Sequence, residues 1–167
     1  MSDPVVLITG ALTGIGRATA LAYARQGANL VVSGRHADVG EQFARELTDL
    51  GAPAQFARAD VGFDADVKDL VDRAVARFGR IDVAVNNAGT EGTPGPVTEV
   101  TDEAYQATFD TNVKGTLLCL KHEFRVMREQ GGGSIVNSRA SGLSGDRSPV
   151  GDPFVTLSSH EPNLRQR

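Results

Sequence analysis

The segment from Val5 to Gly16 constrains this chain more than any other stretch of similar length. A short apolar run, long enough for one buried strand, leads directly into a turn that contains Gly10 and Gly14. The residues that follow have the apolar spacing of an amphipathic helix. A strand, a glycine turn and a helix N-terminus form an anion site, because free backbone N–H groups and the positive end of the helix dipole converge there. The segment therefore predicts a binding site for a cofactor that carries a pyrophosphate.

Strand-like and helix-like segments alternate along the rest of the chain. The predicted strands are Val5–Thr9, Asn29–Ser33, Ala54–Ala59, Ile81–Asn86 and Ser134–Asn137. The stretches between them repeat apolar residues at helical spacing, and several end just before a glycine. This alternation predicts an α/β fold, a doubly wound, Rossmann-like parallel sheet of about five strands with helices on both faces.

The longest predicted helix covers residues 102–130, with Thr101 as its N-cap and Gly131 just past its end. Its apolar stripe is expected to face the core and consists of Phe109, Val113, Thr116, Leu117, Leu120, Phe124 and Met127. Asn112 lies on the same face, so we expect its amide to be buried and to need partners. Those partners are either backbone groups or a water molecule held in a site.

The end of the second strand indicates which cofactor binds. An acidic residue there would accept hydrogen bonds from the ribose hydroxyls of NAD. This sequence has Arg35 instead, about twenty residues after the glycine turn, and a guanidinium suits the 2′-phosphate of NADP. The alternative is a solvated arginine that opens a loop. We therefore favour NADP, with NAD as the second choice.

Two further segments are expected at the same edge of the sheet. Asp60 and Val61 end the third strand and would meet the adenine base, or Asp60 is a turn residue that caps the next helix. Asn87, Ala88 and Gly89 end the fourth strand and border the cofactor, or they form a simple turn. Ligands of doubly wound sheets bind beyond the carboxyl ends of the strands, which is where both segments would lie.

Taken together, these motifs resemble the short-chain dehydrogenase/reductase family over residues 4–145. The similar segments are the cofactor loop Thr9–Gly16, the sheet-stabilising motif Asn86–Gly89, the segment Asn112–Gly115 with the catalytic asparagine, and the strand Ser134–Asn137 before the catalytic serine. Four motifs in the family's order and spacing are far more specific than any one of them.

The resemblance implies hydride transfer between a nicotinamide cofactor and a small alcohol or carbonyl substrate. The cofactor contacts that it implies are Gly10, Thr13, Gly14, Ile15, Gly16, Arg35, Asp60, Val61, Asn87, Ala88 and Gly89. Asn112 and Ser138 are the implied catalytic residues, with Ser141 competing for the role of Ser138. The alternative is that both serines are ordinary loop residues. The family packs its long helix between subunits, so residues 102–130 are expected to form a contact in a homo-oligomer.

The sequence departs from the family after its fifth predicted strand. The family's proton donor is the tyrosine of a Tyr-x-x-x-Lys pair. Here Tyr23 and Tyr105 are the only tyrosines, and neither is followed by a lysine four residues later. We interpret residues 1–145 as the dinucleotide-binding domain and residues 146–167 as an irregular tail from a shifted reading frame, a mis-spliced transcript or a misassembled gene. By resemblance the chain is an oxidoreductase that is inactive as written. The alternatives are a non-catalytic dinucleotide-binding module and a truncated product without function.

Composition argues against several other classes. A net charge of −4 with scattered basic residues disfavours nucleic acid as a partner. There is no signal-peptide pattern, no apolar run of membrane-spanning length and a single cysteine, Cys119, so we expect a cytoplasmic protein. The isolated histidines lack metal-ligand spacing, and no G-x-S-x-G elbow is present. A methyltransferase on a similar sheet would not be expected to combine Asn86–Gly89 with Asn112.

Overall fold

The computed structural model describes residues 3–138. Its elements are β1 (Val5–Thr9), α1 (Gly14–Ala24), β2 (Asn29–Gly34), α2 (Ala37–Asp49), β3 (Ala54–Arg58), α3 (Asp64–Phe78), β4 (Val83–Asn86), η1 (Val97–Glu99), α4 (Asp102–Phe109), η2 (Asp110–Lys114), α5 (Gly115–Gln130) and β5 (Ser134–Asn137). The predicted tail, its boundary at residue 145 and Ser141 lie outside the described residues.

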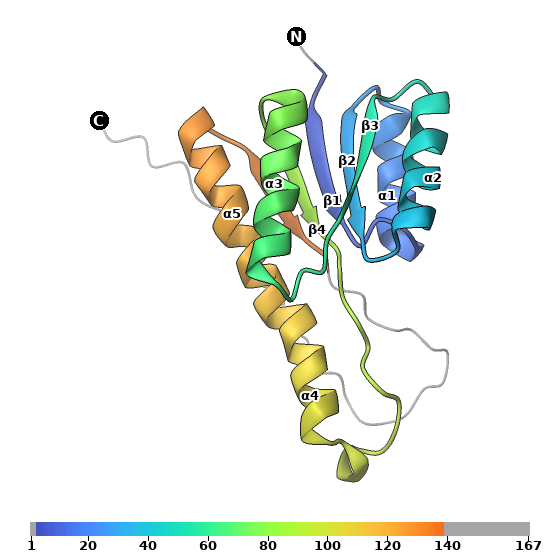
Figure 1. Ribbon diagram of the computed structural model, residues 1–167, viewed down its shortest axis with the longest axis vertical. Coiled ribbons are helices and arrows are strands. Elements are labelled where there is room, and N and C mark those ends of the chain that lie inside the picture. Colours follow the sequence, from blue (N-terminus) through green and yellow to red (C-terminus); the bar gives the residue numbers. More distant parts are fainter. Residues whose placement is uncertain (1–2, 139–167) are drawn as a thin grey trace, which may run out of the picture.

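The five strands form one parallel sheet in the order β3-β2-β1-β4-β5. Helices α1 and α2 cover one face, and α3 and α5 cover the other (Figure 1). The predicted doubly wound α/β fold is thus confirmed. The chain crosses outward from β1 to β3, then returns to place β4 on the other side of β1. The loops after β1 and β4 therefore diverge at the carboxyl edge, where such sheets bind their ligands.

The core has one apolar cluster on each face of the sheet. All five residues of β1 are buried, which is typical of a central parallel strand. Side chains alternate along it, so Ile8 packs in the cluster under α1 and α2, whereas Leu7 packs in the cluster under α3. Both neighbours of β1 are held in register, with Leu7 opposite Val31 on β2 and Ala84 on β4. This pairing fixes where the loops at the carboxyl edge begin.

The ends of β2, β3 and β4 differ from the prediction by one or two residues. β4 begins at Val83, two residues later than predicted, and the N–H of Ile81 donates to Oε1 of Gln130 on α5 and not to a neighbouring strand. The capping predictions are confirmed, since Oγ1 of Thr101 accepts the N–H of Ala104 at 3.2 Å and Gly131 has a φ of +88°.

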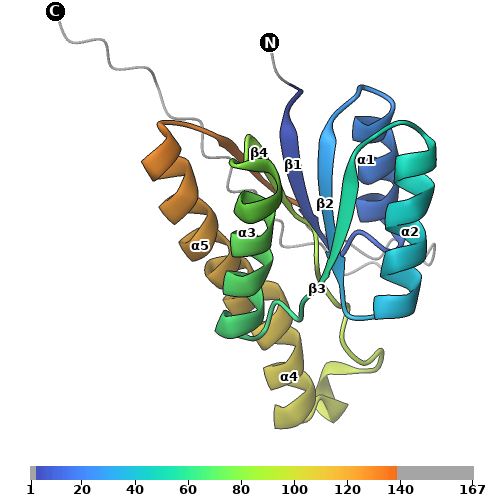
Figure 2. The same ribbon diagram turned by 45° about the horizontal axis from the view of Figure 1, so that its top comes forward.

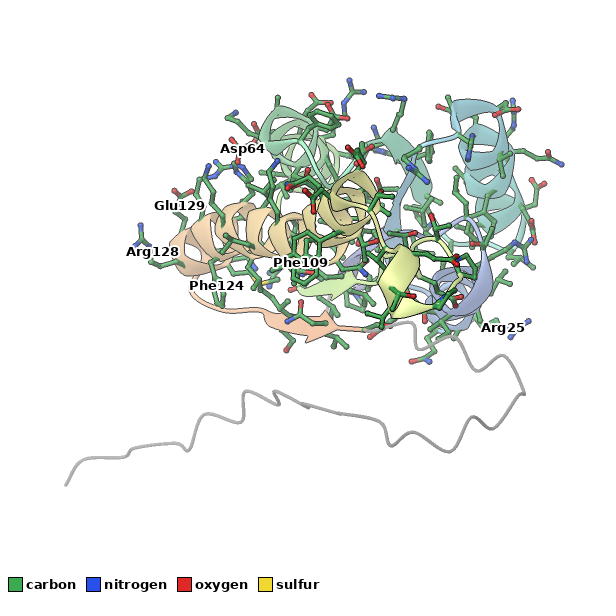
Figure 3. All side chains as sticks on the ribbon, turned by 90° about the horizontal axis from the view of Figure 1, so that it is seen from below. Arg25, Asp64, Phe109, Phe124, Arg128 and Glu129 are labelled. Carbon is green, nitrogen blue, oxygen red and sulfur yellow. The ribbon has the colours of Figure 1, made fainter. Side chains whose placement is uncertain are left out.

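The predicted single helix over residues 102–130 is divided by the π-helical turn η2. Of its expected apolar stripe, Met127 is buried, whereas Phe109, Val113, Leu117 and Phe124 are 44–63% exposed. Figure 3 shows Phe109 and Phe124 on the side of α4 and α5 away from α3. The prediction of a core-facing stripe is therefore wrong. The buried side of α5 is offset from the predicted stripe by one residue toward the N-terminus and consists of Gly115, Cys119, His122, Glu123, Val126 and Met127. Most of these residues are small or polar, so hydrophobicity alone selected the wrong side.

The periphery of the sheet sets the surroundings of the site. α4 lies beyond the carboxyl ends of the strands (Figure 2). Within residues 3–138 no strand pairs with the outer edge of β5, and Val136 on that strand is 49% exposed. In the described residues, no helix combines the length and the apolar character needed to cross a membrane.

Packing between α2 and β3 yields a test of the core. A Cβ on Gly40 would collide with the ring of Phe56, whereas one on Gly132 would meet nothing within 4 Å. We expect Gly40→Ala to lower the free energy of unfolding by about 1–3 kcal/mol, because overpacking forces the ring to move. The matched Gly132→Ala variant should stay within about 0.5 kcal/mol of the unchanged chain. Urea unfolding measures both, and equal stability of the two variants would contradict the packing described.

Candidate nucleotide-binding groove

A groove of about 490 Å³ opens at the carboxyl edge of the sheet. The segments that follow β1, β2, β3 and β4 line it, together with Ala107 and Thr111 from α4 and η2. The predicted cofactor contacts that line it are Gly10, Thr13, Gly14, Ile15, Arg35, Asp60, Val61, Asn87, Ala88 and Gly89. Gly16, Asn112 and Ser138 are not among its lining residues. The fold therefore brings together segments from five parts of the chain.

The glycine turn after β1 depends on the absence of side chains. Gly10 has a φ of +62°, and a Cβ there would lie 2.7 Å from Cα of Ala88. Gly14 has a φ of +52° with open space beside it, so its glycine leaves that wall of the groove free. Gly16 has a different role, because a Cβ on it would collide with the carbonyl oxygen of Gly10 and Nδ2 of Asn87. It allows α1 to pack tightly against the turn.

The N-terminus of α1 faces this groove through Gly14 and Ile15. The side chain of Thr13, its N-cap residue, makes no capping hydrogen bond, and the first turn has no acidic residue. Helices leave their first N–H groups without partners within the helix, and the helix dipole adds positive potential there. This end of the groove is therefore suited to an anion.

Thr9 and Asn87 hold the floor of the groove together. Thr9 is buried, with 1% of the residue exposed. Its Oγ1 accepts the N–H groups of Asn87 at 3.1 Å and Ala88 at 3.2 Å. Nδ2 of Asn87 donates to the carbonyl oxygen of Gly10 at 3.1 Å, and its Oδ1 accepts the hydroxyl of Ser138 at 3.2 Å. These bonds join the ends of β1, β4 and β5. The structural role of Thr9 was missed, since a threonine at the end of a strand has no distinctive sequence signal.

The wall after β2 presents Arg35, which is exposed and lines the groove. No carboxylate within residues 3–138 pairs with its guanidinium. The neighbouring Ser33 also lines the groove, and its buried Oγ has no hydrogen-bond partner in the described part of the chain. A buried polar atom without a partner is uncommon in a native structure. Both groups fit a polar, anionic occupant.

Asp60 makes a turn at the end of β3. Its Oδ1 accepts the N–H of Gly62 at 3.0 Å, and its own N–H donates to Oδ2 of Asp66 at 3.0 Å. The turn interpretation is confirmed, but Asp60 does not cap α3, whose N-cap residue is Phe63. Asp60 and Val61 both line the groove, and contact with adenine stays a prediction.

Asn112 lies in the π-helical turn and is exposed, so the prediction that its amide is buried is wrong. The wide turn separates this position from the buried side of α5. Both ends of the amide are nevertheless bonded, since Oδ1 accepts the N–H of Thr90 at 2.8 Å and Nδ2 donates to the carbonyl oxygen of Thr90 at 2.8 Å. The predicted alternative of bonds to the backbone is thus confirmed. Because Thr90 lines the groove, Asn112 holds one of its walls.

A buried polar group lies behind the groove. Glu123 on α5 is 1% exposed and accepts a hydrogen bond from Nδ2 of Asn86 at 3.0 Å. Burial raises the pKa of Glu123 to about 7, and the bond from Asn86 acts in the opposite direction. Burial raises the pKa of Cys119 to about 12, with a smaller contribution from Glu123, so this thiol is unreactive at neutral pH.

Another charged group links α5 to α3. Asp64 contacts Lys121 at 2.7 Å and Nε2 of the buried His122 at 2.9 Å, on the side of α5 that faces α3 (Figure 3). The hydrogen bond from Lys121, followed by that from His122, lowers the pKa of Asp64. Asp64 and Lys121 are exposed, and none of these three residues lines the groove.

Comparison with known proteins identifies the family. The family model described as short chain dehydrogenase matches residues 4–150. The chain belongs to this family. It is 33% identical over 143 residues to 3beta-hydroxysteroid dehydrogenase of Mediterraneibacter gnavus, covering 86% of this chain and 52% of that protein. It is 38% identical over 161 residues to A-factor type gamma-butyrolactone 1'-reductase (1S-forming) of Streptomyces virginiae, covering 96% and 62%.

Solved structures of the short-chain dehydrogenase family agree with the fold. Levodione reductase superposes with a TM-score of 0.78 at 37% identity, covering 82% of this chain and 54% of that one. A variant of actinorhodin polyketide ketoreductase with NADPH gives a TM-score of 0.77 at 34% identity, covering 81% and 52%. The chain thus spans about half the length of several curated relatives that it matches.

The bonds of Thr9 yield a test of the groove floor. Thr9→Val keeps the shape of the side chain but leaves the N–H groups of Asn87 and Ala88 without their acceptor. We expect the free energy of unfolding to fall by about 1–3 kcal/mol, because buried donors lose their partner. Thr9→Ser keeps the hydroxyl and should lose clearly less. Chemical denaturation compares the two, and a valine variant as stable as the serine variant would argue against these bonds.

Proposed function

We propose that this chain binds a nicotinamide dinucleotide in the groove, with NADP preferred over NAD. The binding would serve an oxidoreductase of the short-chain dehydrogenase family that acts on an alcohol or carbonyl compound. The observation that carries the proposal is the convergence of the glycine turn, the N-terminus of α1 and Arg35 on one groove. The similarity to a ketoreductase whose structure was solved with NADPH supports the cofactor class.

The groove offers a suitable group for each charged part of the cofactor. Backbone N–H groups at Gly14 and Ile15 would hold the diphosphate, since a helix N-terminus favours negative charge and no side chain blocks the approach. The guanidinium of Arg35 would pair with the 2′-phosphate through charge-assisted hydrogen bonds. Asp60 and Val61 would meet the adenine base. The residues of the groove therefore fit the cofactor that the family implies.

Bound nicotinamide supplies or accepts a hydride. The chain's own residues would orient it, and Asn112 would act by holding the Thr90 wall because both ends of its amide are already bonded. The hydroxyl of Ser138, which donates to Asn87, is the group that we propose to contact the substrate oxygen. Gly16 would contribute by packing and Asn87 by fixing the loop of Gly10.

The exposed apolar residues of α4, η2 and α5 support the predicted contact between copies of the chain. Phe109, Val113, Leu117 and Phe124 are all at least 44% exposed. Apolar residues that gather on one side of two adjoining helices mark an interaction surface more often than a surface that stays open to solvent. We propose that this side meets a second copy.

Arg35 tests the cofactor preference. Arg35→Ala should weaken NADPH binding by about 10- to 100-fold, since a charge-assisted bond contributes roughly 1.5–3 kcal/mol, and should leave NADH binding nearly unchanged. Fluorescence titration of NADPH and NADH measures both affinities. Arg25→Ala is the matched control, because Arg25 caps the C-terminus of α1, at the opposite end of that helix from the groove. An unchanged NADPH-to-NADH ratio in Arg35→Ala would refute the assignment.

Turnover separates a complete enzyme from a binding module. The sequence has no Tyr-x-x-x-Lys pair, so the proton that must accompany hydride transfer lacks the family's donor. We expect the 167-residue chain to bind NADPH without oxidising it when aldehydes and ketones are added. Absorbance of NADPH at saturating cofactor checks this. Substrate-dependent oxidation above the buffer rate would show that another group donates the proton.

A further inference from the structure

Glu123 is a buried acid that the proposed chemistry does not use. Its carboxyl group faces the sheet from α5, and Asn86 is its one hydrogen-bond partner within residues 3–138. The neighbouring charged residues of α5 pair with α3 instead. Lys121 and His122 contact Asp64, and Arg125 contacts Asp72. The titratable group that interacts with Glu123 is Cys119, one turn earlier on α5, and it stays protonated. No described cation offsets the charge of this carboxylate.

Asn86 connects this acid to the end of β5. Its Nδ2 donates to Oε2 of Glu123 at 3.0 Å and to Oδ1 of Asn137 at 3.1 Å. Its Oδ1 is buried and has no partner among the described residues. A carboxylate can only accept hydrogen bonds, so it favours this orientation of the amide.

Protonation of Glu123 would favour the opposite orientation. A carboxylic acid has an O–H to donate, and a buried donor needs an acceptor. If the amide of Asn86 turns over, its oxygen takes the position of Nδ2 and accepts that O–H. The exposed amide of Asn137 can then turn as well and donate to the same oxygen. One proton taken from solvent thus reverses the direction of two hydrogen bonds and breaks no covalent bond. The NH2 of Asn86 then takes the position of Oδ1, where no described group accepts its hydrogens, so the reversed arrangement is less well satisfied than the carboxylate form. The burial that raises the pKa of Glu123 to about 7 brings this change near neutral pH.

The reversal would occur directly beside the groove floor. Asn86 and Asn137 are register partners across β4 and β5, and the N–H of Ser138 donates to the carbonyl oxygen of Asn86 at 2.9 Å. The next residues along the two strands, Asn87 and Ser138, are themselves hydrogen-bonded. Asn87 in turn holds Gly10. A short chain of contacts therefore leads from Glu123 to the glycine turn.

We propose that Glu123 is a positioning residue for the nucleotide groove and that its protonation state sets the hydrogen-bond direction at Asn86 and Asn137. The proposal rests on the proposed nucleotide binding for its effect on affinity. The carboxylate form holds the arrangement described, so the groove is best formed above neutral pH and loosens as the acid is protonated.

The coupled change in hydrogen-bond direction at Asn86 and Asn137, called the relay below, is tested without nucleotide. Side-chain amide signals of Asn86 and Asn137, and the backbone amide of Ser138, are followed by NMR from pH 5.5 to 8.5. We expect one common midpoint near pH 7 in the unchanged chain and in Glu129→Gln, which removes an exposed acid from the same helix. Glu123→Gln keeps an acceptor for Asn86 and should abolish the titration. Signals that do not titrate, or that still titrate in Glu123→Gln, would overturn the relay.

The effect on the groove is tested by NADPH fluorescence at pH 6 and pH 8. When the pH falls from 8 to 6, the NADPH affinity of the unchanged chain should fall by at least about fivefold more than the affinity of Glu123→Gln. A fivefold difference is the lower end of typical coupling between two sites in a protein. The 2′-phosphate of NADPH also changes its charge over this pH range. This change affects the affinity of every variant equally, so it cancels when the pH 8 to pH 6 ratios of two variants are compared. Equal ratios would overturn the positioning role. Failure of the unchanged chain and all variants to bind NADPH at either pH would refute the proposed function. The NMR titration alone would then decide whether the relay exists.

Discussion

The hydrogen bonds between the end of β1 and the start of the loop after β4 control the rest of the site. β4 pairs with β1 after two outward crossovers, so nothing in the local sequence holds the two loops together. Thr9 accepts two N–H groups from the loop after β4, and Asn87 returns a bond to Gly10. Since Gly10 and Ala88 approach closely, each loop limits the conformation of the other. The groove is a consequence of this mutual support.

The same region concentrates buried polar groups that an apolar core would avoid. Asn86, Glu123 and Ser33 are all buried, and each either lacks one partner or titrates near neutral pH. Unsatisfied buried groups cost stability, and Ser33 and Asn86 place two of them at or beside the groove. The opposite end, where β1 begins, is closed by a bond from the N–H of Val5 to Asp82.

The sequence predicted the fold well because its strongest signals are periodic. The apolar run of β1 and the alternation of strands and helices defined the sheet, and the glycine turn located the groove. Two kinds of feature could not be predicted. The π-helical turn that exposes Asn112 could not be predicted, because helical periodicity assumes a constant pitch. The stripe from Phe109 to Phe124 is exposed because the buried side of α5 carries mostly small and polar residues. Thr9 and Glu123 gave no signal, since a side chain's long-range partner is not encoded in its neighbours.

The π-helical turn also has a consequence for how the groove tolerates change. Ala107 and Thr111 reach the groove wall, while α5 is anchored on the sheet through Val126 and Met127. The wide turn of η2 takes up one extra residue, so the helices on either side of it keep their relative orientation. Loss of one residue from η2 would therefore restore an ordinary helix and leave α4 over the groove. A deletion in α5 between η2 and Val126 has no such turn to absorb it, and it would rotate α4 by about 100° and carry Ala107 away from the wall.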